Sequence, residues 1–307
     1  MMRCLLRNIL VSLILFSIIC SCDNSRKQDR LETVSVDSIT ELPLPSVPSG
    51  ITTTEDRAAF VARHFWDALD FRSDPLAVDT AFMEQNFANF ISVLAVTPQD
   101  RAGEAVQGLC KMALGNPDAF SLLESVAEKY LDDPNSPMRN EDLFILFLQD
   151  WESSDSVGEA TRERAKFRLA RAMKNRRGTL AADFRFVDRQ GRETTLFKSL
   201  GTAATLLMFY DPDCPQCEET KKAIAASQEA EGVRVVAIDI AGDRRLWDET
   251  KAAMPPAWTV GYALDPLEEE ETYVFPALPT LYLLDPTGRV LLKDPPLNLL
   301  LNPNPVD

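Results

Sequence analysis

The chain has 307 residues, of which 45% are hydrophobic and 26% charged, a composition typical of a globular protein with one large domain or two ordinary ones. Its 32 basic and 47 acidic residues give a formal net charge of −15. This charge repels phosphate backbones and anionic lipid surfaces, so it argues against nucleic-acid binding.

The first residues are typical of an export signal. Arg3 and Arg7 are followed by an apolar run over residues 9–20, which is too short to span a bilayer comfortably. The run ends in the sequence ICSC at 19–22, which resembles the lipobox of bacterial lipoproteins. The resemblance implies cleavage before Cys22 and attachment of lipid to its thiol. A plain cleaved signal and an uncleaved anchor remain alternatives.

Cleavage of residues 1–21 removes two basic residues and no acidic one, which takes the net charge from −15 to −17. With Cys22 lipidated, only Cys110, Cys214 and Cys217 keep free thiols, so the fold depends on an apolar core and not on a disulfide framework. We expect a lipid-anchored protein of the cell envelope that faces the periplasm or the exterior. The choice between inner and outer membrane stays open.

Two segments follow the signal peptide. Residues 22–52 are polar and then Pro-rich, which predicts a flexible tether. Residues 53–177 have apolar side chains at helical spacing, with Thr54 as the expected N-cap of the first helix, and they predict an all-α domain. Turn sequences separate five further expected helices, near residues 78–95, 98–114, 117–131, 140–150 and 156–175.

The hydrophobic period changes in residues 178–307. A hairpin is expected around Gly191, buried strands at 202–210 and 233–240, and a helix between them at 217–232. A further helix, a short strand and a final pair of strands follow, at residues 243–254, 258–264 and on either side of the turn at 285–288. Alternating strands and helices predict an α/β domain with a largely parallel central sheet and one antiparallel edge.

The sequence Cys214-Pro-Gln-Cys217 lies directly between an expected buried strand and an expected helix. This position places Cys214 at a helix N-terminus, where unpaired N–H groups and the helix dipole stabilise a thiolate. Pro215 suits the first helical position. Cys217 lies one turn further along, close enough to attack a mixed disulfide that forms at Cys214.

At this point the chain resembles the thioredoxin superfamily, in particular its extracytoplasmic TlpA/ResA-like thiol-disulfide oxidoreductases, over about residues 180–295. The segments that carry the resemblance are "ADFRFVDRQGRETTLFKSLG", "TLLMFYDPDCPQC" and "LPTLYLLDPTGRV". The resemblance implies a central mixed sheet flanked by helices. It also implies that Cys214 attacks a substrate disulfide and that Cys217 resolves the adduct. Leu278 and Pro279, joined by a cis bond, would then shape a docking surface with Pro215 and block metal capture.

The upstream segment is similar to a helical domain of unknown function that precedes thioredoxin-like domains in bacterial envelope lipoproteins. The similarity lies in "RHFWDALDF", "YLDDPNSPMRNEDLF" and "RRGTLAADF". This resemblance implies an all-α domain and brings no known activity with it.

The chain departs from the family pattern beside the cysteine pair. Asp213 replaces the usual Trp, and Met208 occupies the position where thioredoxins often carry a buried proton-transferring carboxylate. The helix dipole stabilises a thiolate at Cys214, whereas negative charge nearby destabilises it and so favours the disulfide. Four carboxylates surround the pair, those of Asp211, Asp213, Glu218 and Glu219. We therefore expect a reduction potential nearer the thioredoxin value of about −270 mV than the DsbA value of about −120 mV.

The cysteine pair has two other interpretations. A metal site needs about four ligands, whereas residues 178–307 contain two Cys and no His, so neither a metal nor another cofactor is expected. A static disulfide in a non-catalytic binding or scaffolding module remains the alternative. The favoured prediction is a thiol-disulfide oxidoreductase whose partners are protein thiols or disulfides of the envelope, with an unknown upstream electron donor.

Overall fold

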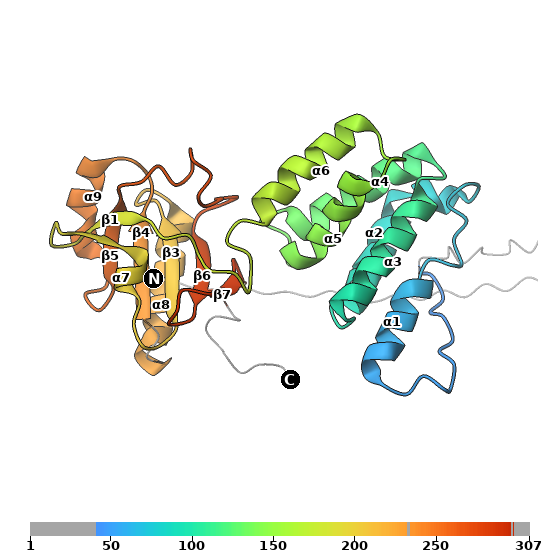
Figure 1. The fold of residues 1–307 in the computed structure, drawn as a ribbon, viewed down its shortest axis with the longest axis horizontal. Helices are drawn as coiled ribbons and strands as arrows, with labels where there is room; N and C mark the ends of the chain where they lie inside the picture. The colour runs from blue at the N-terminus through green and yellow to red at the C-terminus, as the bar shows by residue number, and fades with distance from the viewer. Residues whose placement is uncertain (1–40, 232–233, 296, 298–307) are drawn as a thin grey trace, which may run out of the picture. The chain divides into compact units, whose positions relative to one another are not determined.

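A computed structural model describes residues 41–231, 234–295 and 297 (Figure 1). The predicted signal peptide, the lipidation site at Cys22 and the first part of the predicted tether lie outside the described residues. Within the described residues, no helix combines the length and the apolar character that crossing a membrane requires.

The first part of the described chain is helical, as the sequence predicts (Figure 1). Its elements are α1 (Thr54–His64), η1 (Pro75–Val78), α2 (Thr80–Leu94), α3 (Gln99–Ala113), α4 (Pro117–Ala127), the π-helical turn η2 (Glu128–Asp132), α5 (Glu141–Ser153) and α6 (Glu159–Ala172). Their bounds agree with the expected helices to within a few residues.

The N-cap of α1 differs from the prediction by one residue. Thr53, and not Thr54, has extended backbone angles, and its hydroxyl accepts a hydrogen bond from the amide of Asp56 at 3.1 Å. Thr54 is the first helical residue. Two adjacent threonines offer the same capping hydroxyl, so the sequence alone does not decide between them.

The helical part has a core rich in aromatic side chains. Trp66 packs edge-on against Phe90 with ring centroids 5.8 Å apart, and Phe147 contacts Trp151 at 5.8 Å. Helix α5 is buried on most of its circumference, as its nearly unbroken apolar sequence predicts. The end of the expected tether also joins this core, since Leu42 packs against it.

The second part of the chain forms one seven-stranded sheet with the strand order β2-β1-β5-β4-β3-β6-β7. The strands are β1 (Arg185–Asp188), β2 (Glu193–Thr195), β3 (Thr205–Tyr210), β4 (Arg234–Asp239), β5 (Thr259–Ala263), β6 (Thr280–Leu284) and β7 (Val290–Lys293). The intervening helices are α7 (Leu196–Ser199), α8 (Pro215–Glu231), α9 (Arg244–Thr250) and the short η3 (Lys251–Ala253).

The expectation of a largely parallel sheet with one antiparallel edge is wrong. Only β3, β4 and β5 pair in parallel, and antiparallel strands flank them on both sides. The hairpins β1–β2 and β6–β7 have connections too short for a parallel crossover, so each adds an antiparallel pair. The sheet is therefore mixed, as the family resemblance implies.

Each face of the sheet has its own apolar core. Alternate residues of β3 point to opposite faces: Leu207 and Phe209 belong to one core, and Met208 and Tyr210 belong to the other. Cys217, from α8, packs in the second core together with Met208 and Tyr210. The face that α8 covers is therefore the face on which the cysteine chemistry is built.

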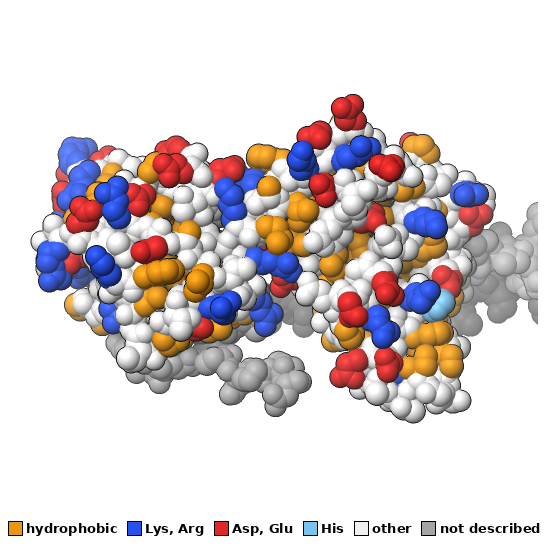
Figure 2. Space-filling view, in the orientation of Figure 1, with side chains coloured by type: hydrophobic (Ala, Val, Ile, Leu, Met, Phe, Trp, Pro, Cys, Tyr) orange, Lys and Arg blue, Asp and Glu red, His pale blue; other side chains and the backbone are white. Residues whose placement is uncertain are grey.

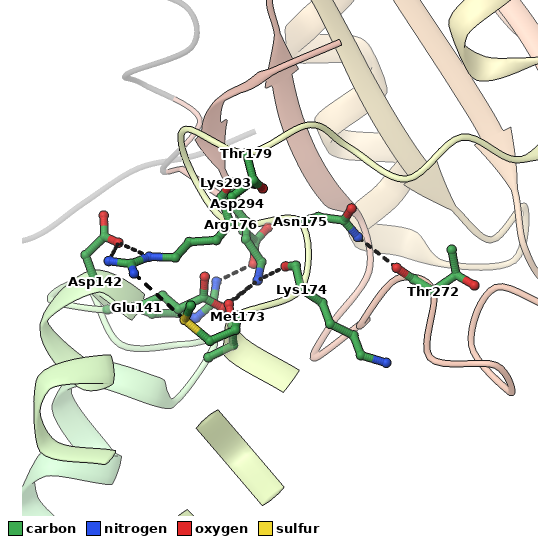
Figure 3. A network of polar contacts seen from close by, with 12 residues as sticks. Glu141, Asp142, Met173, Lys174, Asn175, Arg176, Thr179, Thr272, Lys293 and Asp294 are labelled. Atoms are coloured by element: carbon green, nitrogen blue, oxygen red, sulfur yellow. Dashed lines mark hydrogen bonds and ion pairs between the residues drawn. The ribbon is translucent and has the colours of Figure 1, made fainter. Parts of the chain in front are cut away.

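A lysine of β7 completes the end of helix α6 (Figure 3). The Lys293 ammonium donates to the carbonyl oxygens of Ala172 at 3.2 Å and Lys174 at 3.0 Å, and it pairs with Glu141 at 2.8 Å. The last carbonyls of a helix have no partner within the helix, so a cation at this position satisfies them and interacts favourably with the dipole.

Candidate active site

Cys214 directly precedes helix α8. Pro215 is the first helical residue and lacks the N–H that would be unpaired there, as the sequence predicts. The carbonyl oxygen of Cys214 accepts hydrogen bonds from the amides of Cys217 at 3.1 Å and Glu218 at 3.2 Å. Cys214 thus occupies the N-cap position, directly after strand β3 and its short loop.

The sulfur of Cys214 does what a capping hydroxyl does at other helices. It accepts the amide N–H of Cys217 at 3.1 Å, and it lies 3.6 Å from the carbonyl oxygen of Leu278. An amide donor aimed at the sulfur stabilises negative charge there. The Cys214 sulfur is therefore held between the first amides of α8 and the Leu278 carbonyl, to which its S–H donates.

The two thiols of the pair differ in exposure. Cys214 is half-exposed, whereas Cys217 is only 3% exposed, and both are free thiols in the structure. Burial, together with the neighbouring Cys214, raises the pKa of the Cys217 thiol well above its ordinary value. One sulfur is thus accessible to an incoming disulfide, and the other is shielded and holds its proton.

The predicted docking residues lie beside the pair. The Leu278–Pro279 peptide bond is cis, as the family resemblance implies, and both residues are half-buried. Leu278 packs against the same apolar core as Cys217, and Pro215 is exposed. Cys214 and Leu278 are therefore brought together from positions 64 residues apart in the chain.

The charges around the pair are more balanced than the sequence indicates. Glu218 forms ion pairs with Lys221 and, at 3.4 Å, with Lys222, and these contacts lower its pKa. Asp213 is exposed, and its amide donates to a carboxylate oxygen of Asp211 at 2.8 Å. Acidic and basic side chains are also interspersed over the face that Figure 2 shows. The acidic excess is therefore not concentrated into a single patch on that face.

A pocket of about 130 Å³ lies beside Cys217. Its lining includes Met208, Tyr210, Asp211, Cys217 and Lys221. Across residues 41–295, apart from the gap at 232–233, no three His, Cys, Asp or Glu side chains cluster as metal ligands would.

Sequence reasoning missed two polar residues near this pocket, Tyr210 and Asp239. They are the last residues of β3 and β4 and are paired with each other in the parallel register. The signal in the sequence is an acidic residue that closes the otherwise apolar strand ending in "VVAID". Because side chains at the carboxyl ends of adjacent parallel strands lie close together, that residue is a candidate for the site.

Comparison with protein families gives two matches. Residues 21–175, half of the chain, match the family described as Domain of unknown function (DUF5106), and residues 190–294 match the family described as Thioredoxin-like domain. Among solved structures, the chain is similar to a thioredoxin-like protein from Bacteroides caccae, with 30% identity and a TM-score of 0.76. The similarity covers 84% of this chain and 96% of that one.

The chain is a thioredoxin-like protein of the DUF5106 family. The predicted resemblance to the thioredoxin superfamily, with a preceding helical domain of unknown function, is thereby confirmed. The predicted fold class is confirmed as well.

Other solved structures are similar to parts of this thioredoxin-like protein. A conserved protein of unknown function from Bacteroides fragilis is 34% identical over 40% of this chain and 95% of its own, with a TM-score of 0.37. The thioredoxin domain of a thiol-disulfide oxidoreductase from Bacteroides vulgatus is 18% identical over 39% and 88%, with a TM-score of 0.35. Comparison with curated proteins gives no match.

Proposed function

We propose that this thioredoxin-like protein is an extracytoplasmic thiol-disulfide oxidoreductase that acts through Cys214 and Cys217. One observation carries the proposal: the half-exposed Cys214 sulfur caps α8, accepts the Cys217 amide at 3.1 Å and lies beside the Leu278 carbonyl. A sulfur held in this way is an accessible nucleophile with a second thiol one helical turn behind it.

The exchange takes two steps. The Cys214 thiolate attacks one sulfur of a substrate disulfide, which forms a mixed disulfide and releases the other substrate sulfur as a thiolate. Cys217 then loses its proton and attacks Cys214, which releases the second substrate sulfur and leaves a Cys214–Cys217 disulfide. The substrate gains two electrons, and a dithiol donor must reduce the pair again. Half-buried Pro279 and Leu278 form part of the surface where the substrate docks.

Reduction of insulin tests the enzymatic proposal. With dithiothreitol as donor, the protein lacking residues 1–21 should accelerate insulin reduction, and Cys214→Ser should abolish the acceleration. Cys110→Ser is the matched control, because Cys110 is fully buried in the helical core and should not contribute. Equal rates with and without the protein would instead favour a binding module with a static disulfide.

The location in the cell envelope is proposed from the first residues alone. Cleavage before Cys22 and lipid attachment to it would hold the protein at a membrane, with the described residues facing the periplasm or the exterior. Metabolic labelling with a fatty-acid analogue should label the wild-type protein and not a Cys22→Ser variant. Equal labelling of both would contradict the assignment of the anchor.

A further inference from the structure

A group of buried polar atoms lies behind the cysteine pair. The Tyr210 hydroxyl, Asp239 Oδ2, the Trp247 indole nitrogen and Arg189 Nε are all buried. The Trp247 indole acts on the Tyr210 hydroxyl as a hydrogen-bond donor, whereas within the described part of the chain Asp239 Oδ2 and Arg189 Nε have no hydrogen-bond partner. Buried polar groups in native proteins nearly always have partners, and leaving them without one is destabilising. Asp239 Oδ2, a buried acceptor without a donor at the end of the strand beside β3, is therefore a candidate for a functional role.

The sheet register places two of these groups next to each other, and one of them, Tyr210, packs in the same core as Cys217. Tyr210 and Asp239 are paired at the carboxyl ends of the parallel strands β3 and β4. Both side chains point to the face of the sheet that packs against Cys217, because residues paired in this register point the same way. Tyr210 is 4% exposed and Asp239 is fully buried.

Tyr210 and Asp239 also line two different pockets. Tyr210 lines the pocket of about 130 Å³ together with Cys217, and Asp239 lines a second pocket of about 190 Å³ together with Tyr262 and Asp265. Roughly 10–15 Å³ of such free space holds one water molecule, so each pocket has room for several. The Tyr210–Asp239 pair therefore lies between the pocket beside Cys217 and the second pocket, and both have room for water.

The chemistry of the pair requires a proton acceptor at this place. Burial raises the pKa of Cys217, so at neutral pH its thiol must give up a proton before it can attack. Met208, at the position where a buried carboxylate often performs this task, has no acidic group. Burial raises the pKa of Asp239 to about 6, so this side chain is a carboxylate at neutral pH and becomes a proton donor just below it.

The charges near Asp239 come from several elements. Asp211 and Asp243 add to the raised pKa of Asp239, and the amide of Ala241 opposes it by donating to Oδ1 at 2.9 Å. Asp239, Cys217, Arg189 and Trp247 all act on the pKa of Tyr210, which is raised mainly by burial. The titratable and charged groups on neighbouring elements are Tyr210, Asp211, Cys217, Asp243, Arg189, Arg244, Lys251 and Tyr262, together with Asp265, Glu268 and Glu269, which line the second pocket.

We propose that Asp239, acting through the Tyr210 hydroxyl and pocket water, accepts the proton of Cys217 when the mixed disulfide is resolved. This inference rests on the proposed function. The Cys217 S–H bond breaks, and its proton passes to the Asp239 carboxylate. The Cys217 thiolate then attacks Cys214, the Cys214–substrate bond breaks as the Cys214–Cys217 bond forms, and the substrate sulfur leaves as a thiolate. In the reverse direction, protonated Asp239 returns the proton.

Rapid mixing of the reduced protein with dithiobis(nitrobenzoate) separates the two steps. Attack by Cys214 releases the first coloured thiolate, and resolution by Cys217 releases the second. In the wild-type protein, the resolution rate should rise with pH through an inflection near 6. Asp239→Asn should lose this inflection and resolve at least about tenfold more slowly at neutral pH. The two rates should converge at alkaline pH, where hydroxide deprotonates Cys217 directly.

Matched variants separate a proton-transfer role from a structural one. Tyr210→Phe should slow resolution in the same pH-dependent way, and Asp239→Glu should restore part of the inflection. Asp285→Asn is the control, because it removes a carboxylate of the same domain that lies far from the cysteine pair. Asp285 follows Leu284, which pairs with the first residue of β3, at the end opposite Tyr210. The resolution rate of this variant should match that of the wild-type protein at every pH. The rate of the first step should not change in any variant, and no variant should release more thiolate than the wild-type protein, because the fully buried Cys110 reacts only if a variant unfolds.

The outcomes distinguish this inference from the proposed function. If the wild-type protein releases no second thiolate, the resolving role of Cys217 fails and the inference fails with it. If the wild-type protein resolves the adduct and Asp239→Asn keeps the inflection near pH 6, only the inference is overturned. A fall in the resolution rate by the same factor at every pH would likewise overturn it, because that result indicates a structural effect.

Discussion

At the scale of single residues, two thiols of one motif have different environments. The Cys214 sulfur caps a helix and is half-exposed, whereas Cys217 is 3% exposed behind it. Strand β3 positions the first, and packing of α8 on the sheet buries the second. This difference supports a division of roles in which one sulfur meets the substrate and the other keeps its proton until the adduct has formed.

Asp239 gives a stability prediction with a definite sign. Its carboxyl has a pKa of 3.8 as a reference and about 6 in the folded protein. The protonated carboxyl therefore contributes stability that is complete below pH 3.8 and is lost as the pH rises through 6. Relative to the wild-type protein, Asp239→Asn should gain up to about 3 kcal/mol of unfolding free energy between about pH 3.5 and 7.5. Urea denaturation at a series of pH values measures this difference.

Asp285→Asn is the control, because the pH dependence of its stability relative to the wild-type protein should have the opposite sign. Hydrogen bonds from the Thr287 hydroxyl and the amide of Arg289 lower the pKa of Asp285, so its contribution is present above pH 3.8 and lost below it. The free energy of unfolding of Asp285→Asn should therefore fall relative to that of the wild-type protein as the pH rises through the titration of Asp285. If Asp239→Asn and Asp285→Asn change in the same direction, the burial argument for Asp239 is wrong.

At the scale of secondary-structure elements, the close approach of β1 and β5 depends on a glycine. A Cβ atom at Gly261 would lie 2.2 Å from the ring of Phe186, which is fully buried. We expect Gly261→Ala to lower the free energy of unfolding by about 1–3 kcal/mol, because the ring must move in a packed core. Denaturant unfolding followed by tryptophan fluorescence measures this change.

Gly108→Ala is the matched control within a helix. Gly108 lies inside α3, and no atom of a neighbouring element lies within 4 Å of the position that a Cβ atom would take there. Alanine at this position should raise the free energy of unfolding by about 0.5–1 kcal/mol, because glycine is a poor helix former. Equal effects of the two substitutions would contradict the steric argument at Gly261.

The elements themselves could be predicted because their signals are local. The period of apolar residues indicates the helices and strands, and Asn140 caps α5 by accepting the amide of Leu143 at 3.0 Å. Strand directions at the sheet edges and the pairing of Tyr210 with Asp239 are long-range features. No local pattern encodes which strand lies beside which, so the sequence reveals the cysteine pair and not the polar pair behind it.

At the scale of the whole molecule, Lys293 joins residues that are distant in sequence. Its side chain is 10% exposed and contacts Glu141 and the end of α6. Lys293→Met should lower the free energy of unfolding by about 1–3 kcal/mol, because it leaves the partly buried Glu141 carboxylate and the carbonyls of Ala172 and Lys174 without their cation. Lys222→Met removes an exposed pair with Glu218 and should change stability by less than about 0.5 kcal/mol. Denaturant unfolding of both variants distinguishes them, and equal losses would contradict a role for Lys293.

The central claim is that Cys214 and Cys217 exchange disulfides with other proteins, and trapping in cells tests it most directly. In a Cys217→Ser variant the mixed disulfide cannot be resolved, so we predict covalent adducts that disappear on reduction and that mass spectrometry identifies as envelope proteins. A Cys214→Ser, Cys217→Ser double variant should give none. If the single variant gives no adduct, or the same adducts as the double variant, the account of this protein as a thiol-disulfide oxidoreductase is contradicted.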